Sequence, residues 1–327
     1  MSPAPAAAFR PGGDGRLWLL VVAFVALVAA LLAPRITLPR EARDVLLVID
    51  VTGSMNVRDA SPSGAPLSRL AAARQAGRAL LANLPCQSRL GLGIFTERRT
   101  FLLFEPAEVC ENFAAIDGAI DALDWRMAWE GDSYVARGIH SGIAIAASLH
   151  SDLVFLTDGH EAPPLAGGTL PSFDGKADEV AGLLLGVGSV DPSPIPKFDD
   201  DGREVGFYAE NDVPQENRSG PPPADAPSRA GWNPRNAPWG GEAASGTEHL
   251  SALREAHLRA LAGQTGLHYA RLADPRTVGG LVAQATRPRP VSARVDTAFI
   301  PATLALCALA TLYATGVATR RRSPILD

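Results

Sequence analysis

Three oxygen-bearing side chains at alternate positions form the strongest chemical pattern in this chain: Asp50, Thr52 and Ser54. They follow the apolar run 45–49, which is typical of a strand buried on both faces in a parallel sheet. Gly53 allows a tight turn that would bring one carboxylate and two hydroxyls to a common centre. Such hard oxygen ligands suit Mg²⁺ or Mn²⁺. The stretch therefore predicts a metal-binding turn at the carboxyl end of a strand.

Two further oxygen donors follow later elements. Ser133 precedes a predicted helix, and Asp158 ends a predicted strand, 153–157. Since the carboxyl ends of parallel strands gather at one edge of a sheet, we expect Asp158 beside Asp50. The alternative is that these residues only cap helices and turns, where Asp, Ser and Thr are common. His160 is the one histidine next to this turn, and a solvated loop position is its alternative role.

The five positions resemble the metal-ion-dependent adhesion site of von Willebrand factor A (VWA) domains. Thr52 and Ser133 each exchange the hydroxyl residue usual in that family for the other one. The resemblance implies an α/β fold with a doubly wound, mostly parallel, Rossmann-like sheet and one antiparallel edge strand. It also implies that a metal ion, Mg²⁺ or Mn²⁺, keeps one coordination position for a carboxylate of a partner protein. The implied ligands are Asp50, Thr52, Ser54, Ser133 and Asp158.

Motifs and composition argue against the other classes of function. We find no nucleophile elbow, recognisable Cys–His pair, phosphate-binding glycine loop or zinc motif, so we expect no enzyme. A net charge of −5 provides no basic field for nucleic acid. With 46% hydrophobic and 20% charged residues, the chain can build a core. We therefore expect a folded binding protein.

Two apolar segments, 17–33 and 298–319, predict transmembrane helices. An arginine triplet opens the segment 320–327, which predicts that this tail and the tail 1–16 are cytoplasmic. A cleaved signal peptide is the alternative for the first segment. The VWA domain, 44–286, would then lie in the periplasm, anchored to a bacterial inner membrane by two spans.

Two cysteines bracket a predicted hairpin. Cys86 and Cys110 flank the strand-like runs 89–96 and 100–105. The open ends of an antiparallel hairpin would bring the two cysteines together. A disulfide suits a domain outside the cytoplasm, and two buried thiols are the alternative.

Two irregular segments allow more than one interpretation. The proline-rich excursion 191–247 predicts extended chain, with one hairpin over 198–208. The acidic triplet 199–201 could bind Ca²⁺ or form a solvated turn. The loop 124–131 holds two tryptophans, which could form an exposed contact surface or pack against the rim of the sheet.

The layout of a VWA domain between two predicted spans resembles the bacterial Bat-type proteins, which work with MoxR-type ATPases. The segments 52–59, 124–131 and 157–164 are most similar to MxaL-like accessory proteins of methanol oxidation. That resemblance implies a maturation factor that helps activate a quinone-dependent methanol dehydrogenase, at a step such as Ca²⁺ insertion. It also implies other VWA or accessory proteins and a MoxR-type ATPase as partners. The alternative is a Bat-like scaffold in an envelope complex for stress tolerance.

Overall fold

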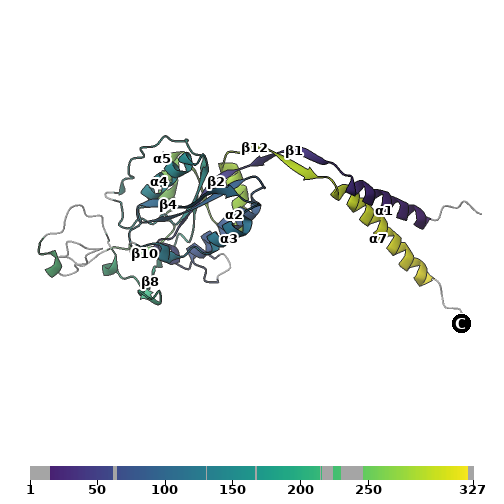
Figure 1. The fold of residues 1–327 in the computed structure, drawn as a ribbon. Coiled ribbons are helices and arrows are strands. Elements are labelled where there is room, and N and C mark those ends of the chain that lie inside the picture. Colours follow the sequence, from purple (N-terminus) through teal and green to yellow (C-terminus); the bar gives the residue numbers. More distant parts are fainter. Residues whose placement is uncertain are drawn as a thin grey trace, which may run out of the picture. The chain divides into compact units, whose positions relative to one another are not determined.

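The computed structural model describes residues 15–61, 65–129, 131–165, 168–213, 215, 224–229 and 246–322 (Figure 1). The chain divides into two compact units. We call residues 41–290 the sheet unit, and residues 1–40 with 291–327 the terminal unit.

A six-stranded sheet of order β11-β6-β5-β2-β3-β4 forms the centre of the sheet unit. The strands from β11 to β3 are parallel, and β4 is antiparallel at the edge. Their bounds are β2 Asp44–Asp50, β3 Arg89–Thr96, β4 Arg99–Glu108, β5 Asp152–Thr157, β6 Gly182–Gly186 and β11 His268–Arg271. The predicted mostly parallel sheet with one antiparallel edge strand is confirmed.

Helices cover both faces of this sheet (Figure 1). Because side chains alternate along a strand, Leu47 and Ile49 of β2 pack in one core, and Leu46 and Val48 pack in the other. The sheet is therefore doubly wound, and β2 is buried on both faces. The first core includes α2 Arg69–Asn83, α3 Phe113–Asp121 and α6 Val278–Ala285, and the second includes α4 Val135–Ser148 and α5 Glu255–Thr265.

Local signals explain where α2 begins and ends. The Ser68 hydroxyl accepts a hydrogen bond from the Ala71 N–H at 3.1 Å, which satisfies one of the free donors of the first turn. Pro85 follows Leu84 and cannot continue the helix. Short 3₁₀ helices lie at η1 Gly53–Asn56, η2 Trp125–Met127, η4 Glu210–Asp212, η5 Ala226–Ser228 and η6 Pro275–Thr277.

The proline-rich excursion is described in part. β8 Pro196–Phe198 and β9 Glu204–Phe207 form a hairpin close to the predicted one, and β7 Ser193–Pro194 pairs with β10 Leu250–Ser251. In the hairpin turn, Asp199 accepts a hydrogen bond from the Arg203 N–H at 2.8 Å, and Asp201 pairs with the Arg203 side chain. These contacts favour a solvated turn for the acidic triplet. Within 191–247, residues 214, 216–223 and 230–245 lie outside the described residues.

In the terminal unit, two helices coincide with the predicted spans. They contact each other, and the two strands beside them pair. Within the described residues, however, no helix combines the length and the apolar character that crossing a membrane requires. The two predicted spans are not confirmed, and most of both predicted tails lies outside the described residues. The elements are α1 Gly15–Leu31, β1 Arg35–Ala42, β12 Arg289–Asp296 and α7 Phe299–Arg322.

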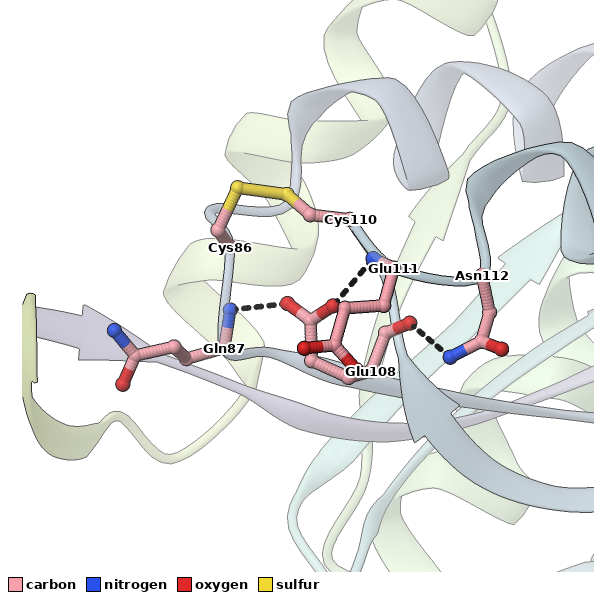
Figure 2. The surroundings of a disulfide bond; sticks show 6 residues. All are labelled: Cys86, Gln87, Glu108, Cys110, Glu111 and Asn112. Carbon is pink, nitrogen blue, oxygen red and sulfur yellow. Dashed lines mark hydrogen bonds between the residues drawn. A yellow bond between two sulfur atoms is a disulfide. The ribbon is translucent and has the colours of Figure 1, made fainter.

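A disulfide bond joins Cys86 to Cys110 at the open end of the β3–β4 hairpin, with the Cα atoms 5.3 Å apart (Figure 2). The Glu108 carboxylate holds both flanking segments, because it accepts hydrogen bonds from the N–H groups of Gln87 at 2.5 Å and Glu111 at 2.6 Å. Among the described His, Cys, Asp and Glu side chains, these cysteines and Glu108 form the only cluster of three potential metal ligands. Since the two sulfur atoms are bonded to each other, this cluster is not a metal site.

Gly138 lies where α4 approaches the sheet closely: a Cβ there would lie 2.2 Å from ring carbons of Phe95. We expect Gly138→Ala to lower the free energy of unfolding by about 1–3 kcal/mol, because the buried ring must move. Gly118→Ala in α3 is the control, since nothing lies within 4 Å of the added Cβ. That change should stabilise the protein by roughly 0.5–1 kcal/mol. Urea unfolding measures both, and equal effects would contradict the close approach.

Candidate metal centre

The Asp50 carboxylate is fully buried at the carboxyl end of β2 and accepts three hydrogen bonds. Its Oδ1 accepts from the backbone N–H and the hydroxyl of Thr52, at 2.9 and 2.7 Å. Its Oδ2 accepts from the Thr157 hydroxyl at 2.6 Å. The hydroxyl oxygens of Thr52 and Ser54 lie 3.4 Å apart. The structure thus brings the first three predicted ligands together and adds Thr157 from β5.

Asp158 follows β5, which pairs directly with β2, and its carboxylate is also fully buried. Its Oδ2 accepts hydrogen bonds from the Arg69 guanidinium at 2.5 Å and from the Ser251 hydroxyl at 3.0 Å. Its Oδ1 accepts one from the His160 N–H at 3.0 Å. The second predicted aspartate therefore reaches the same edge of the sheet as the turn that follows β2.

Ser133 is fixed at this edge by its backbone. It exchanges two hydrogen bonds with Ala162, at 2.6 and 2.7 Å, and it pairs with Glu97 where β3 ends. The Ser133 side chain is buried, yet its hydroxyl has no hydrogen-bond partner. Because an unpaired buried hydroxyl is costly and uncommon, this oxygen is available as a ligand.

The two carboxylates differ in their electrostatic environment. Burial, together with the charge of Asp158, raises the pKa of Asp50 to about 7. Burial acts in the same direction on Asp158, but the Arg69 guanidinium together with hydrogen bonds such as that from the His160 N–H holds the pKa of Asp158 below its ordinary value. Asp50 has no ion pair in the described part of the chain. Two carboxylates and three hydroxyls form a set of hard oxygen donors that fits Mg²⁺ or Mn²⁺.

His160 serves the site through its backbone. Its ring is buried, and burial lowers the pKa of His160 to about 4, which keeps the ring neutral near pH 7. Ring Nε2 lies 3.9 Å from the Glu248 carboxylate, and ring Nδ1 has no hydrogen-bond partner. A role of the ring at the site stays a prediction.

Three residues of this network were not predicted: Arg69, Thr157 and Ser251. Arg69 is the first residue of α2, and its side chain has no exposed surface. It lies at helical spacing from the buried Ala73 and Leu80. A charged residue on a core-facing stripe is a sequence signal for a buried ionic partner. Thr157 and Ser251 carry no comparable signal, since one hydroxyl in a short strand is common.

The two tryptophans of the loop 124–131 occupy different environments. Trp125 stacks on Phe198 of β8, with ring centroids 4.4 Å apart. Trp129 meets Phe101 edge-on at 4.8 Å and remains 53% exposed. One tryptophan therefore packs against the hairpin, and the other leaves a surface for contact.

Residues 45–160 match the family model of the von Willebrand factor type A domain. All five predicted ligands lie within the matched residues. These residues, which carry β2, β3, β4 and β5 of the doubly wound sheet, are therefore similar to a VWA domain.

The solved structures that resemble this chain have low identity to it. An aerotolerance-related membrane protein from Bacteroides fragilis NCTC 9343, with multiple mutations to serines, is 16% identical with a TM-score of 0.46, covering 75% of this chain and 98% of that one. A von Willebrand factor type A protein from Catenulispora acidiphila is 12% identical with a TM-score of 0.40, covering 84% of this chain and 47% of that one. An uncharacterized membrane spanning protein from Vibrio fischeri is 16% identical with a TM-score of 0.28, covering 74% and 96%. All three TM-scores are below 0.5, so neither the fold nor the function of this chain is inferred from these likenesses. No protein of curated function matches the chain in sequence.

Thr157→Val removes the donor to Asp50 and the acceptor for the Gly159 N–H. We expect the free energy of unfolding to fall by about 1–3 kcal/mol, because buried polar groups lose their partners. Thr96→Val is the matched control at the end of β3, since the buried Thr96 hydroxyl has no partner to lose. Chemical denaturation in EDTA should show no loss for this control. Equal losses in the two variants would contradict the assigned hydrogen bonds.

Proposed function

We propose that the VWA domain is a divalent-metal-dependent binding module and that the chain is a membrane-anchored protein without catalytic activity of its own. The observation that carries this proposal is the buried Ser133 hydroxyl without a partner, at the edge of the sheet where the other donors lie. A carboxylate of a partner protein would complete the coordination of the ion. The proposed ligands of Mg²⁺ or Mn²⁺ are Asp50, Thr52, Ser54, Ser133 and Asp158.

The electrostatics of the carboxylate pair support this proposal. Asp50 is buried close enough to Asp158 for the two charges to repel each other, and only Asp158 has a cationic partner. A divalent ion would relieve the repulsion and would gain hard oxygen ligands. Since Mg²⁺ prefers six oxygen ligands, protein side chains, water and one external carboxylate suit its coordination.

Exposed apolar side chains in the terminal unit support membrane anchoring. Trp18 and Phe24 of α1 and Phe299 and Leu306 of α7 are all more than half exposed. Large exposed apolar surfaces mark membrane or protein interfaces. The disulfide between Cys86 and Cys110 suits an oxidising compartment, which supports a periplasmic VWA domain at the bacterial inner membrane.

As the client we propose a quinone-dependent methanol dehydrogenase, supported by the resemblance of three segments to MxaL-like accessory proteins. A Bat-like envelope scaffold that works with a MoxR-type ATPase is the alternative within the same superfamily. Affinity capture from detergent-solubilised membranes with Mg²⁺ distinguishes them. A quinoprotein dehydrogenase or its accessory proteins would favour the first role, and an ATPase with envelope proteins the second. Retention of the same partners in EDTA would contradict metal-dependent binding.

Ser133→Ala separates metal binding from folding. Because the hydroxyl has no partner, we expect stability in EDTA to stay within about 0.5 kcal/mol of the native value. Mg²⁺ at a hundred times its Kd should stabilise the native protein by about 2.7 kcal/mol. A tenfold weaker Kd in Ser133→Ala would remove roughly half of that gain. Thermal unfolding of the full chain in detergent measures both effects.

Ser148→Ala is the matched control, because Ser148 is exposed at the end of α4, the helix that follows Ser133, and its hydroxyl bonds only to the backbone of that helix. It should respond to Mg²⁺ as the native protein does. An undiminished Mg²⁺ response in Ser133→Ala would remove Ser133 from the ligand set.

A further inference from the structure

Arg69 is a fully buried cation whose guanidinium joins two carboxylates. Its Nε and Nη2 donate to Asp59 at 2.9 and 2.6 Å, and its Nη1 donates to Asp158 at 2.5 Å. Ser251 accepts from the same group through its hydroxyl at 2.6 Å and its carbonyl at 3.1 Å. A planar guanidinium suits this kind of forked, fixed binding, which a lysine would not reproduce.

The surrounding chain leaves the guanidinium little freedom to move. Gly188 has a φ of +111°, and a Cβ at that position would lie 2.4 Å from Nε of Arg69. Asp59, on the other side, is also bound by the Ser189 N–H at 3.2 Å. The contacts of Arg69 therefore come from four separate segments: the loop after η1, the end of β5, the turn after β6, and β10.

The Asp158 carboxylate already accepts hydrogen bonds at both of its oxygen atoms. Its Oδ2 faces Arg69 and Ser251, and its Oδ1 faces the His160 N–H. A carboxylate offers about four acceptor positions, so the Arg69 contact uses one that a metal ion would otherwise take. A fixed positive charge beside the site also repels a divalent cation.

We propose that Arg69 is a positioning residue that acts as the internal counter-ion of the metal site: it holds Asp158 in place without metal and, by competing for that carboxylate, weakens metal binding. Asp59 moderates this effect, because it shares the guanidinium and offsets its charge. This proposal rests on the proposed function, since it assumes that the site binds a divalent ion.

The proposed role predicts opposite effects of two substitutions. Arg69→Met removes the competing cation, so Mg²⁺ should bind tighter, by about tenfold, although stability in EDTA falls. Asp59→Asn removes the negative charge that offsets part of the Arg69 charge. The guanidinium then interacts more strongly with Asp158, so Mg²⁺ should bind several-fold weaker. A purely structural role would weaken Mg²⁺ binding in both variants, because both loosen the same network.

Isothermal titration of the full chain in detergent with Mg²⁺, together with thermal unfolding in EDTA, tests this prediction. Arg78→Met is the matched control: Arg78 lies on the same helix and also binds two carboxylates, Asp117 and Asp121, but it is exposed. Its Mg²⁺ affinity should equal that of the native protein. Unchanged or weaker affinity in a folded Arg69→Met variant would overturn the proposal.

Each of the other possible outcomes supports or refutes either this proposal or the proposed function. If Arg69→Met folds only when Mg²⁺ is present, the metal replaces the missing cation and the proposal is supported. If that variant fails to fold in either condition, Asp59→Asn decides: weaker affinity with near-native stability in EDTA supports the proposal, whereas weaker affinity with lost stability, or affinity equal to or tighter than native, overturns it. A native protein that binds no Mg²⁺, or that binds it as well after Asp50→Ala, would instead refute the proposed function. Binding that is lost in Asp50→Ala but unaffected by the Arg69 and Asp59 substitutions would refute only this inference.

Discussion

Burial of two carboxylates at the ends of adjacent strands is the constraint on which the edge of this sheet depends. Moving a charged carboxylate out of water costs several kcal/mol, so each must receive donors or a cation from the surrounding chain. Asp50 receives hydroxyls and a backbone N–H, whereas Asp158 receives a guanidinium, a hydroxyl and a backbone N–H. The turns that end β2 and β5 are shaped by these requirements.

The chain between β6 and α5 takes part in this arrangement. Ser251 of β10 binds both Arg69 and Asp158, and β10 is held by pairing with β7 at the start of the proline-rich excursion. The β8–β9 hairpin is tied to the turn region by the ion pair between Glu204 and Arg58. β7 and the β8–β9 hairpin therefore help to hold the segments that contact Asp158 and the turn after β2.

The buried Arg69 cation bears on whether the domain stays folded when no metal ion is bound. A site stabilised only by its metal ion loses its fold with the ion, because binding and folding are coupled. With Arg69 balancing Asp158, the carboxylate edge keeps a partner for one of its charges in the absence of metal. On the proposed function, metal occupancy can then change partner binding without unfolding the domain.

Local patterns in the sequence determined the parts of this protein whose contacts are short-range. The apolar run 45–49 and the turn after it predicted β2 and the oxygen-bearing side chains that gather at its end, because strand burial and tight turns depend on neighbouring residues. The bracketing of one hairpin by Cys86 and Cys110 predicted their pairing for the same reason. The tertiary structure decided the partners of Asp158, since Arg69 and Ser251 lie 89 and 93 residues away from it in the chain. Those contacts form only when the start of α2 and the short strand β10 pack against the end of β5. The local periodicity of the sequence does not show which distant segments pack together.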